Sequence, residues 1–244
     1  MKAVPDAAAG RRLDPGTKRL DRSGELAISD FDTYAVEEGL KLKEAAGEGE
    51  VVVVSMGPER AIDALRKALA MGADRAVLIT DSALEGADLL VTAKALAGAL
   101  ETEAPDLVLF GQQSADGGGA VLWAAVAEKL RRPVISQVSE LTVDGGSVTG
   151  KRQTEFGYDA IRAPLPAIVA VSDAINTPRY PSLKGIMGAK KKPQETVSPA
   201  DAGSSATTVV ELSPPPPRGE ARKIEDDGTG AEKIVEFLAE KRLV

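Results

Sequence analysis

A glycine-rich segment, residues 111–119 with the sequence GQQSADGGG, has the composition of a phosphate-binding loop. It follows a short apolar run and precedes a stretch with helical spacing, so it is expected to join the carboxyl end of a strand to the start of a helix. Glycines let a ligand approach the backbone closely, and the first turn of a helix offers unpaired N–H groups to a phosphate. The segment therefore predicts a nucleotide site; a tight connection that binds nothing is the alternative.

Two residue types are missing from the chain, cysteine and histidine. Without cysteine, disulfides, thiolate zinc sites, cysteine-ligated iron–sulfur clusters and thiol redox chemistry are excluded. Without histidine, a Ser-His-Asp triad, histidine-ligated metal and imidazole general-base catalysis are excluded as well. We therefore expect no catalytic residue and no metal site, and any redox chemistry requires a cofactor to carry the electrons.

The charge balance excludes further functions. The 244 residues carry 30 Lys and Arg against 37 Asp and Glu, a net charge of −7, and only 3% are aromatic. An acidic chain without interleaved basic and aromatic residues is a poor nucleic-acid or anionic-membrane binder. No apolar run is long enough to span a membrane, and no segment has the pattern of a signal peptide. We therefore expect a cytoplasmic protein.

Strand and helix patterns alternate through the middle of the chain. Continuous aliphatic runs predict buried strands, and apolar residues at helical spacing between them predict helices. The predicted strands are residues 50–56, 74–80, 106–110 and 133–138. The alternation indicates right-handed βαβ crossovers, and hence a doubly wound, mostly parallel sheet of the α/β class.

The flanks of this region have a different pattern. Residues 13–30 predict a hairpin that turns at residues 23–24. An antiparallel extension is predicted from residues 141–143, 147–150 and 165–171. Beyond residue 172 we expect no further sheet.

The C-terminal part is expected to form an arm. Residues 200–219 are polar and contain four consecutive prolines, 214–217, which predict a stiff polyproline segment. A final amphipathic helix at 231–241 carries Ile234, Val235 and Leu238 on one side. We divide the chain into an α/β domain, 1–185, and an arm, 186–244. Because such an arm buries little against its own body, we expect it to embrace another subunit; an unattached tail is the alternative.

One segment carries a family resemblance. Residues 176–187, NTPRYPSLKGIM, followed by the lysines at 190–192, resemble the signature loop of the beta subunit of electron transfer flavoproteins. Further matches are spread over the chain, at residues 35–38, 55–58, 68–75, 106–111, 151–152 and 164–166. The resemblance implies a heterodimer in which an alpha subunit holds most of the FAD, while the beta subunit often holds a structural AMP.

The same resemblance implies a function. The chain would be a non-catalytic electron carrier subunit, accepting electrons from flavin dehydrogenases such as acyl-CoA dehydrogenases and passing them to a quinone reductase or similar acceptor. Leu183 matches the exposed leucine that fills an apolar pocket on the dehydrogenase; a leucine packed beneath the loop is the alternative. The predicted docking residues are Tyr180, Pro181, Leu183, Lys184, Ile186 and Met187. The lysines at 190–192 either guide an acidic partner or complement the dipole of a short helix.

The predicted cofactor contacts combine the glycine-rich loop with positions that match the family: Phe31, Asp32, Met56, Gly111, Gln113, Asp116, Gly117, Gly118, Gly119 and Ala120. The pattern departs from the family after Asp116, where Gly119, Val121 and Leu122 offer no side-chain hydrogen bond. Asp30 would also repel a phosphate, in a place where the family often has asparagine and proline. FAD is therefore expected at the shared site, and AMP is left open.

The chain opens inside another family motif. Residues 1–6, MKAVPD, match a Lys-x-Val-Pro-Asp motif that follows a hydrophobic strand in the family. We expect this first strand to lie upstream of Met1 in the natural chain; a true truncation, with another segment filling the gap, is the rival hypothesis.

Two other classes of function fit the same core. One is a stand-alone nucleotide-binding or nucleotide-hydrolysing α/β protein, and the other is an assembly scaffold without nucleotide. Against hydrolysis, the chain has no P-loop Gly-Lys-Ser/Thr sequence and no nucleophile elbow.

Overall fold

The computed structural model describes residues 1–6, 12–213, 216–217, 223–224 and 226–244. Residues 1–209 form one compact unit and residues 210–244 a second. The expected division between residues 185 and 186 falls inside helix α5 (Leu183–Ala189), within the first unit. Strand β12 (Gln194–Val197) also belongs to this unit, so sheet structure continues beyond residue 172, contrary to expectation.

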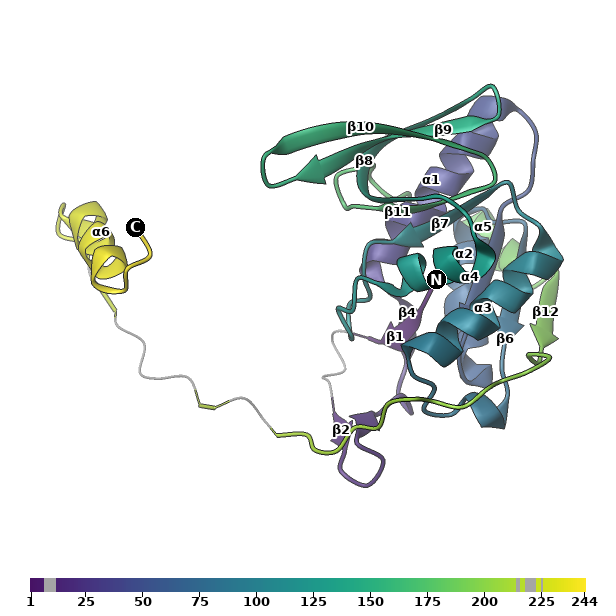
Figure 1. Ribbon diagram of the computed structural model, residues 1–244, viewed down its shortest axis with the longest axis horizontal. Coiled ribbons are helices and arrows are strands. Elements are labelled where there is room, and N and C mark those ends of the chain that lie inside the picture. The colour runs from purple at the N-terminus through teal and green to yellow at the C-terminus, as the bar shows by residue number, and fades with distance from the viewer. Residues whose placement is uncertain (7–11, 214–215, 218–222, 225) are drawn as a thin grey trace. The chain divides into compact units, whose positions relative to one another are not determined.

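Parallel strands form the centre of the first unit (Figure 1). In one sheet, β5 (Val52–Met56) and β12 flank β6 (Arg75–Ile79), and both run parallel to it. In the other sheet, β11 (Ala167–Val171) lies between β7 (Leu107–Gly111) and β8 (Val134–Asp144), again parallel to both. The expected α/β class is confirmed.

Helices lie between these strands, as the apolar spacing predicts, and one further helix, α1 (Asp30–Ala46), precedes them. The helices are α1, α2 (Ile62–Met71), α3 (Leu89–Glu103) and α4 (Leu122–Leu130), with short 3-10 turns η2 (Glu59–Ala61) and η3 (Ser82–Leu84). The buried face of α2 consists of alanines and leucines, among them Ala64, Leu65, Ala68 and Leu69. The small alanines let the helix approach the sheet closely, while the leucines fill the space between the two layers.

The two sheets lie next to each other without pairing. A Cβ atom on Gly39 of α1 would be 3.6 Å from Val51 Cγ1 and 3.7 Å from Leu109 Cδ1, so one helix covers the neighbourhood of both β5 and β7. Among the described residues, however, no ladder joins β5 to β7. The amine of Met1 donates to the carbonyl oxygen of Val54 in β5, at 2.8 Å.

The N-terminal hairpin differs from the prediction. It turns at residues 15–18, between β2 (Leu13–Asp14) and β3 (Arg19–Leu20), and not at residues 23–24. Asp14 causes this, because its Oδ1 accepts the N–H groups of Gly16 (2.7 Å) and Thr17 (3.2 Å). The expected returning strand, β4 (Leu26–Ile28), instead pairs antiparallel with β1 (Ala3–Pro5).

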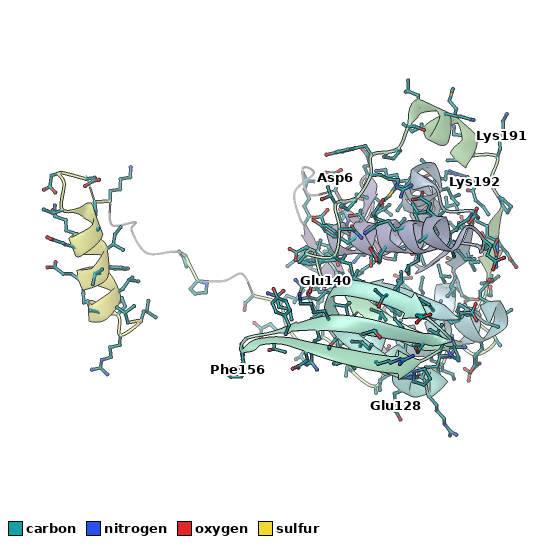
Figure 2. All side chains as sticks on the ribbon, turned by 90° about the horizontal axis from the view of Figure 1, so that it is seen from above. Asp6, Glu128, Glu140, Phe156, Lys191 and Lys192 are labelled. Carbon is teal, nitrogen blue, oxygen red and sulfur yellow. The ribbon has the colours of Figure 1, made fainter. Side chains whose placement is uncertain are left out.

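The antiparallel extension is larger than predicted. β8 is one continuous strand whose first half pairs with β11 and whose second half pairs with β9 (Ser147–Thr154). β9 turns into β10 (Gly157–Pro164), which the sequence analysis missed because its exposed residues have no apolar period. Figure 2 shows Phe156 at the tip of this hairpin. β11 was expected to be antiparallel; it is parallel and wholly buried, and its unbroken apolar run is typical of such strands.

The second unit contains helix α6 (Gly230–Glu240), which confirms the predicted terminal helix. Ile234 and Val235 are exposed on it. Of the four predicted polyproline residues, Pro214 and Pro215 lie outside the described residues.

Candidate functional site

Helix α5 and the residues just before it present exposed apolar side chains, which we call the docking surface after the role that the sequence predicts for them: Tyr180, Leu183, Ile186 and Met187. Leu183 is 80% exposed, Tyr180 96% and Met187 72%. Leu183 is the first residue of the helix, after Ser182, whose hydroxyl accepts the N–H of Gly185 at 3.0 Å. Of the other predicted docking residues, Pro181 is half-buried and Lys184 exposed. A leucine packed in the core is excluded for Leu183.

The same helix is tightly seated on α2. A Cβ atom on Gly185 would lie 2.4 Å from the carbonyl oxygen of Ala70, so only glycine permits this approach. Ala189, on the last turn, is buried. Lys192 donates through Nζ to the carbonyl oxygens of Leu69 (2.9 Å) and Ala73 (2.5 Å) at the C-terminal end of α2. The docking surface is therefore exposed on one side and fixed on the other.

The segment before the docking surface is held by α1. Arg179 forms ion pairs with both Glu37 and Glu44 of that helix. Asn176 donates through Nδ2 to Glu38 (3.0 Å) and to the carbonyl oxygen of Tyr34 (3.1 Å). Glu37 and Glu38 are buried, so their charges depend on these partners and on Lys41, which pairs with Glu38.

The glycine-rich loop begins where β7 meets the first turn of α1. A Cβ atom on Gly111 would lie 2.5 Å from the carbonyl carbon of Phe31, which explains the glycine without a ligand. The carboxylate of Asp32 accepts the N–H of Gly111 (3.2 Å) and the N–H of Lys2 (2.6 Å). Both oxygens of Asp32 are thus used to join the loop to the N-terminal segment.

A charged cluster lies within the same loop. The side chain of Asp116 is only 4% exposed and pairs with Lys2, at 2.7 Å, and with Arg22. Burial alone would raise the pKa of Asp116, but the hydrogen bonds from Lys2 and Arg22 hold it well below its ordinary value. The cluster therefore joins one ionised carboxylate of the loop to two cations of the N-terminal segment.

The end of the loop has open backbone and unpaired N–H groups among the described residues. Gly118 and Ala120 have positive φ angles of 57° and 48°, and a Cβ atom on Gly119 would meet nothing within 4 Å. The N–H groups of Leu122 and Trp123, which open α4, have no acceptor among the described residues. The indole N–H of Trp123 donates to the carbonyl oxygen of Gln112 (3.1 Å) and leaves recognition to the backbone. These groups fit a nucleotide phosphate.

The remaining predicted cofactor residues are less closely grouped. Gln113 is half-buried within the loop, and Gly117 lies with its N–H 3.2 Å from the hydroxyl of Ser114. Met56 ends β5 and packs in an apolar cluster that also contains Phe110 and Trp123. The structure places Met56 on the sheet and does not bring it into contact with the charged part of the loop.

Sequence reasoning missed the residues that hold both sites in place. Arg22 and Lys2 were given no role beside the loop, and Glu37 and Glu44 were given none beside the docking surface. The two glutamates are seven residues apart on one helix, and so on one face of it, which was the only local signal. Their basic partners are distant in sequence.

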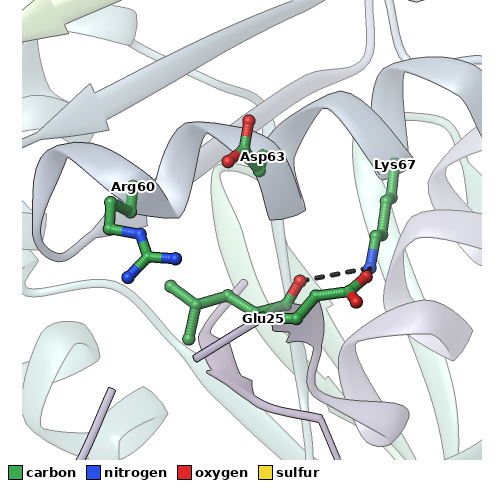
Figure 3. Close-up of a pocket in the computed structure, with 5 residues that line it drawn as sticks. Glu25, Arg60, Asp63 and Lys67 are labelled. Atoms are coloured by element: carbon green, nitrogen blue, oxygen red, sulfur yellow. Dashed lines mark hydrogen bonds and ion pairs between the residues drawn. The ribbon is translucent and has the colours of Figure 1, made fainter. Parts of the chain in front are cut away.

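A pocket elsewhere has no part in these sites. Figure 3 shows it lined by Glu25, Leu26, Arg60, Asp63 and Lys67. Lys67 donates to Glu25 (3.4 Å) and to the carbonyl oxygen of Leu26 (3.1 Å). Its two acidic and two basic side chains balance each other, so it has no charge preference for a ligand.

Two absences hold for the described part of the chain. None of its helices is long and apolar enough to cross a membrane. In the same residues, no group of three or more acidic side chains is arranged to hold a metal ion.

Comparison with known proteins finds similarity to electron transfer flavoproteins along nearly the whole chain. A family model described as "Electron transfer flavoprotein domain" matches residues 17–202. The electron transfer flavoprotein subunit beta of Mycobacterium tuberculosis (strain ATCC 25618 / H37Rv) is 40% identical, over 100% of this chain and 97% of that protein. The protein of the same name from Syntrophomonas wolfei is 38% identical, over 98% and 93%. The caffeyl-CoA reductase-Etf complex subunit CarD of Acetobacterium woodii is 34% identical, over 98% and 95%.

Proposed function

The chain belongs to the electron transfer flavoprotein family as a beta subunit, and on this premise we propose that it forms a heterodimer with an alpha subunit and carries electrons from flavin dehydrogenases to a quinone reductase or a similar acceptor. The name of one relative, a subunit of a caffeyl-CoA reductase complex, supports an acyl-CoA-type dehydrogenase as the electron donor. The proposed role is that of a carrier subunit, in which this chain makes and breaks no covalent bond.

FAD supplies the redox chemistry in this proposal, and the chain's residues bind and orient it. The open backbone at Gly118 and Gly119 and the N–H groups that begin α4 support binding of a phosphate. Lys2 and Arg22 add positive charge beside it. AMP is the second nucleotide that the same loop would accommodate. Mass spectrometry of the denatured heterodimer distinguishes the two cases, since FAD and AMP differ in mass.

The observation that carries the proposal is the docking surface on α5. An apolar side chain such as Leu183, 80% exposed on a helix that is fixed from behind, is suited to fill a pocket on a dehydrogenase. Because the helix is already ordered, little conformational entropy is lost on docking. Such central apolar anchors contribute a large share of binding energy in protein interfaces.

The second unit supports the partnership with an alpha subunit. Residues 210–244 form their own compact unit, and α6 carries exposed Ile234 and Val235. An amphipathic helix with an exposed apolar face gains stability by burying that face on another chain. We assign this face to the alpha subunit.

The test uses the full chain co-expressed with an alpha subunit of the family. Leu183→Ala should leave flavin content unchanged and slow reduction of the flavin by the dehydrogenase about tenfold or more, because burying a leucine contributes about 1.5–3 kcal/mol. Leu13→Ala, at a leucine that is 56% exposed on β2, is the matched control and should reduce at the wild-type rate. Equal rates for Leu183→Ala and wild type would refute the docking role, and a colourless complex would refute the carrier role.

A further inference from the structure

A polar segment, residues 198–207, connects β12 to the end of the first unit; we call it the strap. It contains no helix or strand, yet it is held along its length. Ser198 donates to the carbonyl oxygen of Thr80 (3.4 Å), and Asp201 forms an ion pair with Lys94 of α3. Ser205 donates to the carbonyl oxygen of Gly86, at 3.3 Å.

Asp88 is the residue on which the strap converges. Its Oδ1 caps α3 by accepting the N–H groups of Leu90 and Val91, both at 3.0 Å. Its Oδ2 accepts the N–H groups of Ala206 (2.7 Å) and Thr207 (3.2 Å) and the hydroxyl of Thr207 (3.3 Å). One carboxylate therefore begins a helix and holds the end of the strap.

The backbone of Asp88 adds a third contact, because its N–H donates to the hydroxyl of Ser205 at 2.9 Å. The N–H groups of Val91, Ala206 and Thr207 hold the pKa of the Asp88 carboxyl below its ordinary value. It therefore stays ionised as an acceptor at neutral pH. By contrast, Asp81 caps η3 through the N–H of Ala83 alone and has no strap contact among the described residues.

The contacts between Asp88 and the strap, which we call the tether, lie close in sequence to the boundary between the two units. The first unit ends at Val209, two residues after Thr207, and the second begins at Val210. Exposed apolar side chains follow the tether on both segments, Leu89 and Leu90 on α3 and Val209 and Val210 on the strap side.

We propose that Asp88 is a positioning residue for subunit association, which fixes the point where residues 210–244 leave the first unit. The inference rests on the proposed function, in which these residues bind the alpha subunit. Without the carboxylate, Ala206 and Thr207 lose their acceptor and the last fixed point moves back to Ser205, which still contacts Gly86 and the N–H of Asp88. The residues from 206 to the start of the second unit must then be ordered on binding. Ordering them lowers the effective concentration of the arm at its site and weakens association.

Asp88→Ser tests this in the full chain. Serine is a good helix N-cap and preserves the start of α3, but it has no second oxygen for the strap. Amide hydrogen exchange at Ala206 and Thr207, measured in the isolated chain, should accelerate at least tenfold. The Kd for the alpha subunit should rise about threefold to tenfold. Asp81→Ser, the matched control, should change neither quantity.

A second variant, Thr207→Pro, removes both donors of Thr207, the N–H and the hydroxyl, and leaves Asp88 and the α3 cap intact, so it should raise the Kd in the same way. Unchanged exchange at Ala206 in Asp88→Ser would overturn the tether. Faster exchange with an unchanged Kd in both variants would overturn the positioning role. Failure of the wild-type chain to bind an alpha subunit would instead overturn the proposed function, since the exchange measurement does not depend on a partner.

Discussion

Arg179 holds Glu37 in a two-point contact. Its Nε lies 2.8 Å from Oε2 and its Nη2 lies 2.9 Å from Oε1, while its backbone N–H donates to Oε2 at 3.1 Å. The Glu37 side chain is 7% exposed. Arg179 immediately precedes Tyr180, so this contact fixes the beginning of the docking surface to α1. The other edge of the guanidinium, Nη1 and Nη2, donates to the exposed Glu44.

The first prediction concerns this contact. Arg179→Ala leaves a buried carboxylate without its partner and should lower the free energy of unfolding by about 2–4 kcal/mol. Glu44→Gln removes only the exposed half of the arrangement and should lower it by less than about 1 kcal/mol. Urea unfolding of the two variants measures both values. Equal losses would show that burial of Glu37 does not dominate the contact.

Gly185 and Gly188, on the same helix, make a matched pair. Gly185→Ala places a methyl group 2.4 Å from the carbonyl oxygen of Ala70, so α5 must shift away from α2, at a cost of about 1–3 kcal/mol. A Cβ atom on Gly188 meets nothing within 4 Å, and Gly188→Ala should be neutral or stabilising by up to about 1 kcal/mol. Thermal unfolding compares the stabilities of the two variants, and the rate of flavin reduction by the dehydrogenase is a second measurement. Two equally stable variants would contradict the close seating of α5.

Asp116 predicts a dependence of stability on pH. Its pKa is lowered in the folded chain, while in the unfolded chain it titrates near its ordinary value of about 4. Below that value the unfolded state binds a proton that the folded state does not, so stability from this group is complete above about pH 5 and is lost as the pH falls. Asp116→Asn should therefore destabilise the chain at pH 7 and have a smaller effect at pH 3. Urea unfolding midpoints of the wild type and the variant, measured across that pH range, test this. A stability difference between the two that stays constant with pH would contradict the ion cluster.

The lysines after α5 should separate into two roles. Lys192 satisfies carbonyl oxygens at the end of α2, so Lys192→Gln should lower the free energy of unfolding by about 1 kcal/mol. Lys190 and Lys191 are exposed, and Figure 2 shows Lys191 beside Lys192 after the helix. Lys190→Gln and Lys191→Gln should leave stability within about 0.5 kcal/mol of wild type. If they guide an acidic partner, they should reduce the salt dependence of its association rate. Loss of stability in all three variants would contradict this division.

The candidate sites were predictable to different degrees. The residues of the docking surface were located by the family resemblance of residues 176–187, which are consecutive. Their exposure came from the structure, because an apolar row on a short helix could equally be buried. The glycine-rich loop was also predictable, because its residues are consecutive. The cluster of Asp116 with Lys2 and Arg22 could not be predicted, because Asp116 lies 114 and 94 residues from these two partners. Their pairing depends on how the N-terminal segment lies against the loop.

The sequence by itself determined the α/β class, the positions of the central strands and helices, and the family to which the chain is similar, because apolar period, run length and motif spacing are local properties of the chain. Only the tertiary structure decided that β11 runs parallel between β7 and β8, that β5 and β7 lie under one helix without pairing, and that Arg179 meets Glu37 across 142 residues of sequence. Strand pairing and buried ion pairs gain their free energy from groups brought together by packing, and no local pattern records which distant groups those are.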